Sequence, residues 1–113
     1  MKTVVFGYSD QPEKYAYKAY EMLKSYGHEA ITFNTRTDQF TALPESFHTL
    51  TMYVSEKVSN LMLEDILKLN FQRIIFNPGA ENENLASRCR EKGVHVVEAC
   101  TLVLLRTNQF EKA

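Results

Sequence analysis

The feature that most constrains the fold of this chain is a regular alternation of short apolar runs with amphipathic segments. The runs are rich in β-branched and aromatic residues, and the first of them, residues 3–6, is unbroken by charged residues, which is typical of a strand buried on both faces. We expect five such strands, at residues 3–6, 29–33, 49–54, 73–76 and 94–97. The alternation predicts an α/β fold in three layers, with a doubly wound parallel sheet in the order 3-2-1-4-5.

Helix signals occupy most of the intervening segments. A helix is expected over residues 13–26, with Asp10 and Pro12 as start signals and Gly27 as the terminator. A second helix is expected over residues 58–69 with Ser55 as its cap, and a third follows residue 79 and ends at Gly93. Between residues 34 and 48 the periodicity is lost, so this segment is expected to be a long connection.

Length and composition favour one ordinary globular domain, spanning residues 1–113. The chain has 113 residues, of which 44% are hydrophobic and 24% charged, and its formal net charge is −1. A chain without net positive charge does not attract nucleic acid or an anionic membrane through its overall field. No apolar run approaches the roughly 20 residues of a spanning helix, and no signal peptide is recognisable, so we expect a cytoplasmic protein.

A ligand site is expected at the carboxyl edge of the sheet, where the winding direction reverses. In the expected order this point lies between the first and fourth strands, and the loops 7–12 and 77–81 meet there. Unpaired amides at the bends of Gly7 and Gly79 would converge on one anion, helped by Ser9 and Lys14. The alternative is that Gly7 only turns the chain and Ser9 only caps the helix.

The segment after the second strand narrows the choice of nucleotide. The chain lacks a G-x-G-x-x-G fingerprint, and it has Arg36 where NAD sites usually place an acid that binds the ribose hydroxyls. An arginine would attract a phosphate on the ribose. The ligands that fit are coenzyme A, with its 3′-phosphate, and NADP, with its 2′-phosphate; a solvated loop arginine is the alternative interpretation.

Short motifs recur after each of the five expected strands: residues 6–9 with 14–15, Asn34 with Arg36, 53–55, 77–83 and 98–100. Together they resemble the small stand-alone CoA-binding domain proteins, which are similar to the nucleotide-binding domain of succinyl-CoA ligase α subunits. The resemblance implies a Rossmann-like fold and coenzyme A as the ligand. It places the pyrophosphate near Gly7 and Ser9 and the adenosine near Asn34 and Arg36. Thr35 and Asn77 stand where the family commonly has proline and glutamine.

The sequence thus predicts one set of ligand-binding residues. The set is Gly7, Tyr8, Ser9, Lys14, Tyr15, Asn34, Arg36, Ser55, Asn77, Pro78, Gly79 and Cys100. We expect the pantetheine arm of the ligand to run toward Ser55 and Cys100.

The sequence favours ligand binding without catalysis, as in a carrier, a sensor or a regulatory module. Cys100 is the best candidate for a reactive thiol, but no base can be paired with it, and Cys89 is expected in the core. The three histidines form no catalytic pairing, and no metal site is recognisable. The alternatives are an NADP-dependent reductase, a thiol-dependent acyl transferase using Cys100, and a nucleotide-binding subunit of a larger complex. A homodimer or a partner protein is compatible with the sequence.

Overall fold

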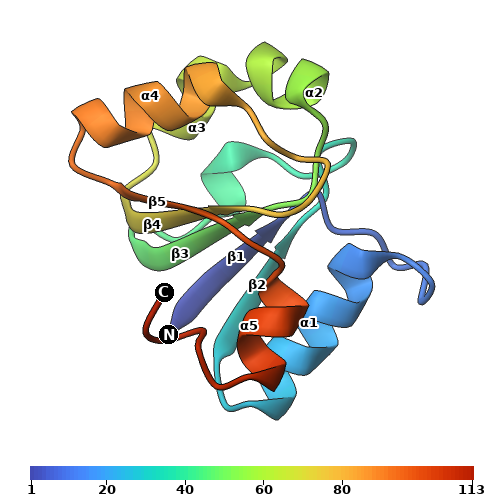
Figure 1. The fold of residues 1–113 in the computed structure, drawn as a ribbon. Helices are drawn as coiled ribbons and strands as arrows, with labels where there is room; N and C mark the ends of the chain where they lie inside the picture. The colour runs from blue at the N-terminus through green and yellow to red at the C-terminus, as the bar shows by residue number, and fades with distance from the viewer.

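Five parallel strands form the centre of the structure, a computed structural model that describes residues 1–113. The strands are β1 (Lys2–Phe6), β2 (Glu29–Phe33), β3 (Phe47–Met52), β4 (Phe71–Phe76) and β5 (His95–Glu98). The helices are α1 (Tyr15–Ser25), α2 (Glu56–Leu61), α3 (Leu63–Leu67), α4 (Glu83–Glu91) and α5 (Thr101–Arg106), with a 3₁₀ turn η1 at Phe40–Ala42. Helices α1 and α5 cover one face of the sheet, and α2, α3 and α4 cover the other (Figure 1). The predicted three-layer α/β architecture is confirmed.

The strand order is β2-β1-β3-β4-β5, which corrects the expected 3-2-1-4-5. Strand β3 pairs with β1 on one side and with β4 on the other, so it is central and not at the edge. Burial agrees with this order, because β3 is buried along almost its whole length whereas in β2 only Phe33 is. The winding therefore reverses between β1 and β3, not between the first and fourth strands.

The long connection 34–46 explains how β3 reaches this position. It leaves the edge strand β2 and returns past β1, crossing the face of the sheet that α2, α3 and α4 also cover. Phe40 of η1 packs against Phe33 and Phe6, with ring centroids 4.9 and 6.0 Å away. The connection is thus anchored in the core although its sequence has no helical periodicity.

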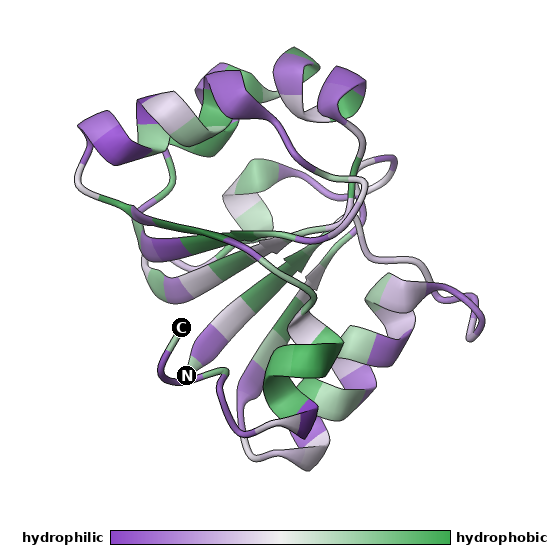
Figure 2. Ribbon diagram, viewed as in Figure 1, coloured by the Kyte–Doolittle hydropathy of each residue, from purple (hydrophilic) through white to green (hydrophobic).

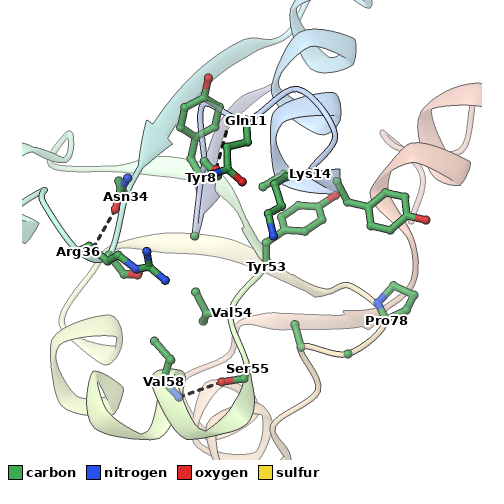
Figure 3. Close-up of a pocket in the computed structure, with 17 residues that line it drawn as sticks. Tyr8, Gln11, Lys14, Asn34, Arg36, Tyr53, Val54, Ser55, Val58 and Pro78 are labelled. Carbon is green, nitrogen blue, oxygen red and sulfur yellow. Dashed lines mark hydrogen bonds between the residues drawn. The ribbon is translucent and has the colours of Figure 1, made fainter.

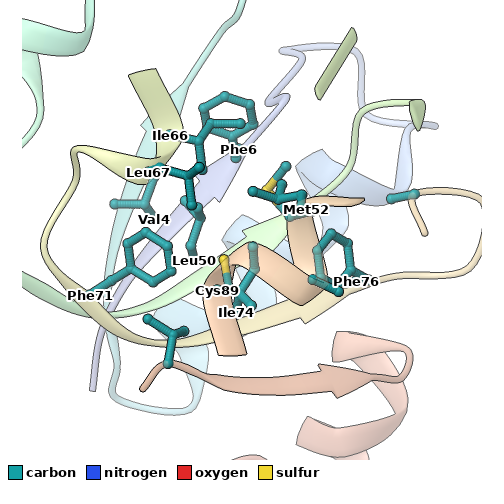
Figure 4. Close-up of a cluster of buried hydrophobic side chains, with 14 of the residues drawn as sticks. Val4, Phe6, Leu50, Met52, Ile66, Leu67, Phe71, Ile74, Phe76 and Cys89 are labelled. Carbon is teal, nitrogen blue, oxygen red and sulfur yellow. The ribbon is translucent and has the colours of Figure 1, made fainter. Parts of the chain in front are cut away.

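Alternating side chains along the central strands supply two separate cores. Val4, Phe6 and Ile74 belong to a large cluster with residues of α3 and α4 (Figure 4). Val5 and Ile75 point to the opposite face and join residues of α1 and α5. Because successive strand residues face opposite sides, a sheet covered on both faces buries nearly every side chain of its central strands, and most of these are apolar, with exceptions such as Thr49, Thr51 and Arg73. This accounts for the mainly apolar runs in the sequence.

Hydropathy follows the same division into layers. Figure 2 shows hydrophobic residues on the strands and on α5, while hydrophilic residues recur along α4 and in the loops. No helix has both the length and the apolar character that crossing a membrane requires.

The element boundaries differ from those expected in ways that shape the loops. Helix α1 starts at Tyr15, and its N-cap residue Lys14 makes no side-chain capping bond, so Asp10 and Pro12 do not start it. The loop between β1 and α1 consequently spans residues 7–14. The expected helix 58–69 is two short helices that meet at Met62. Ser55 caps the first of them by accepting a hydrogen bond from the Val58 amide at 3.4 Å, as predicted.

Candidate functional site

A cavity of about 630 Å³ lies at the carboxyl edge of the sheet, where the loops after β1 and β3 come together (Figure 3). Its volume falls within the range of ligand pockets. Four loops supply the residues that line it, together with the beginnings of α1 and α2. These residues are Gly7, Tyr8, Ser9, Gln11, Lys14, Tyr15, Ala16, Asn34, Thr35, Arg36, Tyr53, Val54, Ser55, Val58, Pro78, Gly79 and Ala80. The cavity therefore occupies the position at which doubly wound sheets bind ligands.

Ten of the twelve predicted site residues line this cavity, and Asn77 and Cys100 do not. The residues missed by sequence reasoning are Gln11, Ala16, Thr35, Tyr53, Val54, Val58 and Ala80. Most of them are neighbours of predicted residues on the same loops. Tyr53 and Val54 were expected to end the third strand, but β3 stops at Met52, so both belong to the loop at the point where the winding reverses.

Asn77 lies beneath the cavity in a buried network of hydrogen bonds. Its Nδ2 donates to Thr51 Oγ1 at 2.7 Å and to the Met52 carbonyl at 2.8 Å. Its Oδ1 accepts the Thr101 amide at 2.9 Å, and the Thr51 and Thr101 hydroxyls lie 2.7 Å apart. The side chain of Asn77 is thus fully engaged in joining β3, β4 and α5.

Cys100 lies at the N-cap position of α5 and is half-buried. Since α5 packs beside α1 on one face of the sheet, the residue before it is placed outside the cavity lining. The other thiol, Cys89, is buried in the core as predicted, and burial raises its pKa to about 11.

The bend at Gly7 packs against the loop after β3. Gly7 has φ +97°, and a Cβ added to it would lie 2.6 Å from Val54 Cγ1 and 3.1 Å from the Tyr53 carbonyl carbon. Its amide and that of Tyr8 both donate to the Phe33 carbonyl at 2.9 Å. The expectation that the Gly7 amide is free for an anion is therefore wrong, because the end of β2 already uses it.

The second expected anion-binding amide is also paired. The Gly79 amide donates to Glu81 Oε1 at 3.0 Å. In contrast, the amides of Ser9, Val54 and Ser55 have no hydrogen-bond partner in the protein. The amide of Thr35 after β2 and those of Tyr15 and Ala16 at the start of α1 are also unpaired, so the free amides of the cavity come from three loops and from the first turn of α1.

The turn after β2 is built around Asn34. The Arg36 amide donates to Asn34 Oδ1 at 2.9 Å, and the Asn34 amide donates to Asp38 Oδ2 at 2.8 Å. Asn34 lines the cavity, but its side-chain oxygen is used within the turn.

Lys14 and Arg36 are the only formally charged residues that line the cavity. They come from separate loops and extend into it from opposite sides (Figure 3). Neither takes part in any of the three ion pairs of the structure, all of which lie elsewhere. A site that holds two unpaired cations and no carboxylate, in a chain with a net charge of −1, has the electrostatics of an anion-binding site.

Three tyrosines contribute to the walls in different ways. The ring of Tyr8 stacks on Tyr17 and meets the edge of Tyr20, and it points away from the cavity (Figure 3). Tyr15 stands at the rim with 68% of its surface exposed. The Tyr53 hydroxyl is buried close to the Thr51 and Thr101 side chains but forms no hydrogen bond of normal geometry with them, and burial raises the pKa of its phenol, which stays protonated.

The histidines lie outside the cavity lining, and no group of three or more metal-ligating side chains forms a metal-binding cluster. His28 Nδ1 lies 2.8 Å from the amino group of Met1, and His48 Nδ1 lies 2.7 Å from Thr49 Oγ1. His95 is exposed on β5. Their positions agree with structural roles.

Comparison with known proteins gives a family and several structures of the same fold. The family model described as "CoA binding domain" matches residues 1–106. A crystal structure of an uncharacterized protein is 35% identical, with a TM-score of 0.86 over 96% of this chain and 97% of the other. No curated protein matches the chain.

Two further solved structures share the fold at 17% identity. One is a hypothetical protein from Pyrococcus horikoshii OT3, with a TM-score of 0.83. The superposition covers 94% of this chain and 82% of the other. The other is a protein from Thermus thermophilus, cell-free ID.343, with a TM-score of 0.82. The superposition covers 96% of this chain and 90% of the other.

Proposed function

The chain belongs to the CoA-binding domain family, and on this premise we propose that its cavity binds coenzyme A or an acyl-CoA. We further propose that the protein acts as a carrier, sensor or regulatory module, and that it performs no chemistry on the ligand. Membership of the family and the positive charge of the cavity lining both support coenzyme A as the ligand.

The observation that carries the proposal is the pair of unpaired cations, Lys14 and Arg36, on opposite sides of a cavity without carboxylates. Coenzyme A has two separate anionic groups, a pyrophosphate and a 3′-phosphate on the ribose. Lys14 and the free amide of Ser9 would bind the pyrophosphate, and Arg36 would bind the ribose phosphate through its planar fork of donors.

The remaining walls suit the uncharged part of such a ligand. Val54, Val58 and Ala80 provide apolar surface, and the free amides of Val54 and Ser55 offer donors for carbonyl oxygens. Tyr15 at the rim can cover a bound chain from the solvent side. A mixture of apolar surface and a few directed polar groups is typical of cofactor pockets.

The composition of the lining supports binding without catalysis. Its titratable side chains are tyrosines, one lysine and one arginine, so it contains no histidine, cysteine or carboxylate. Histidine and carboxylate side chains are the usual general bases, so the lining holds neither of the groups that most often activate a serine hydroxyl such as that of Ser9 or Ser55. Cys100, the thiol considered for acyl transfer, is not among the lining residues.

Thermal unfolding in the presence of coenzyme A, dephospho-CoA, NADP and NAD tests the proposal. Coenzyme A should raise the unfolding midpoint with concentration, because a ligand at 100 times its Kd stabilises the folded state by about 2.7 kcal/mol. Dephospho-CoA should raise it less, and NAD should have no effect. A rise with NADP alone would favour the dinucleotide alternative, and no rise with any of the four would contradict the proposal.

A further inference from the structure

The turn that carries Arg36 is held by hydrogen bonds that converge on Asn34. Besides the bonds of its side-chain oxygen to the Arg36 amide and of its own amide to Asp38, the Asn34 carbonyl accepts the amides of Thr37 and Asp38 at 3.3 and 2.9 Å. All hydrogen-bonding groups of the Asn34 main chain are therefore used. A short polar side chain that accepts the amide two residues later is a recognised turn-forming device.

The side chain of Arg36 has no comparable support. Arg36 is exposed, pairs with no carboxylate and makes no side-chain hydrogen bond in the protein. A long flexible side chain loses several rotatable bonds of freedom when it binds a phosphate, so an ordered backbone beneath it reduces the total cost of binding. Arg36 follows directly in this turn, and its side chain extends from the turn into the cavity (Figure 3).

We propose that Asn34 and Asp38 are positioning residues that hold Arg36 at the cavity and thereby give selectivity for a ligand with a phosphate on its ribose. The inference rests on the proposed function, since it concerns the same cavity and the same class of ligand. It assigns Asn34 an indirect role, in contrast to the direct ligand contact expected from the sequence, because its oxygen is occupied within the turn.

Calorimetric titration of Asn34→Ala with coenzyme A and with dephospho-CoA tests the role of Asn34. Affinity for coenzyme A should fall about threefold to tenfold, the equivalent of one hydrogen bond. Affinity for dephospho-CoA should not change, because that ligand lacks the phosphate that Arg36 reads. Asn34→Ser should restore most of the loss, since its hydroxyl can accept the same amide. An equal loss for both ligands would overturn the positioning role.

Thr37→Ala is the matched control within the turn. Thr37 is exposed, its side chain makes no hydrogen bond, and it does not line the cavity. The substitution should leave both affinities at the wild-type values. A loss as large as that of Asn34→Ala would mean that any change in this segment weakens binding, which would overturn the specific role of Asn34.

The test of Asp38 must separate the hydrogen bond that its side chain accepts from the Asn34 amide from the effect of its negative charge. Asp38→Asn keeps an oxygen that can accept the Asn34 amide, so it should bind coenzyme A nearly as wild type does, while Asp38→Ala should weaken binding. If the charge alone mattered, both variants would bind coenzyme A more tightly, because each removes a negative charge near the phosphate. That result would overturn the role proposed for Asp38.

A double variant shows whether Asn34 acts through Arg36. In a variant that already carries Arg36→Ala, the side chain that binds the ribose phosphate is absent. Adding Asn34→Ala should then cause no further loss of affinity for coenzyme A, and an additive loss would overturn the inference. Failure of the proposed function looks different. If wild type does not bind coenzyme A, both proposals fail. If wild type binds coenzyme A but Arg36→Ala leaves the preference over dephospho-CoA unchanged, or Asn34→Ala has no effect, only this inference fails.

Discussion

Gly7 and Val54 are so close that a Cβ on Gly7 would lie 2.6 Å from Val54 Cγ1. This contact joins the loops after β1 and β3 at the place where the winding of the sheet reverses. A glycine here was expected because a phosphate could approach it closely. In the structure, glycine is required at this position for packing, because Tyr53 and Val54 of the neighbouring loop fill the space that a side chain would occupy.

Gly7→Ala should therefore destabilise the fold by about 2–4 kcal/mol, from the positive φ and from overpacking together. Gly27→Ala is the matched control, because Gly27 also has a positive φ, +86°, but an added Cβ would meet nothing within 4 Å. That variant should lose only the backbone part, about 1–2 kcal/mol. Urea unfolding measures both, and equal losses would contradict the packing role.

Lys14→Ala and Arg36→Ala should weaken binding in different patterns. Loss of Lys14 removes a charge assigned to the pyrophosphate, so coenzyme A and dephospho-CoA should both bind about tenfold more weakly. Loss of the Arg36 side chain should weaken the binding of coenzyme A but not that of dephospho-CoA. Lys57→Ala, which removes the same charge from an exposed position outside the cavity, is the control for the overall field. Calorimetric titration distinguishes these patterns, and identical ones would refute the assignment of two phosphate sites.

Asn77→Ala should cost stability rather than ligand contacts. The substitution leaves the buried Thr101 amide without its partner and removes one of the two hydrogen bonds that the Met52 carbonyl accepts, and the expected loss is about 2–4 kcal/mol. Asn70→Ala is a suitable comparison because Asn70 is exposed and its side chain makes no hydrogen bond. Chemical denaturation of both variants gives the difference, and a loss no greater than that of Asn70→Ala would show that the network adds nothing.

Tyr53→Phe should leave the folded state equally stable or stabilise it by up to about 1 kcal/mol, because it removes a buried hydroxyl that has no hydrogen-bond partner. The substitution keeps the ring that lines the cavity. Thermal unfolding without ligand is the measurement. A clear loss of stability would mean that the hydroxyl makes a hydrogen bond in solution.

Stability should fall as the pH drops below about 6.5, in part through His28. Burial lowers the pKa of His28 below 6.5, and the nearby positive amino group of Met1 lowers it further. The folded state therefore binds a proton at this site less readily than the unfolded chain does, so the neutral ring contributes stability above pH 6.5 that is lost on acidification.

Unfolding midpoints of His28→Gln between pH 5 and pH 7.5 should show a weaker pH dependence than those of wild type. Some dependence should remain, because burial also lowers the pKa of His48. A slope in His28→Gln equal to that of wild type would rule out this contribution.

Local features of the sequence were sufficient to predict the five strands, the helices between them and most of the cavity, but α5 was not among the expected helices and residues 58–69 form two helices instead of one. Ser55 was recognised as a cap because its hydroxyl precedes a helical pattern, and it does cap α2. Ser9, Lys14 and Arg36 were recognised because they follow strands, and parallel strands bring such residues to one edge. The start of α1 was misplaced because Asp10 and Pro12 are frequent both at helix starts and in the turns of a longer loop.

By itself the sequence determined which segments are strands, where most of the helices lie, that the sheet is parallel, and which loops carry most of the site residues. These properties depend on patterns within short segments. Only the tertiary structure decided that β3 lies beside β1, that Phe33 takes the Gly7 amide, and that Asn77 is enclosed. The physical reason is that buried apolar strands are nearly equivalent as partners, because their ladders use the same backbone groups. The choice among them depends on packing between residues far apart in the chain, such as Gly7 and Val54.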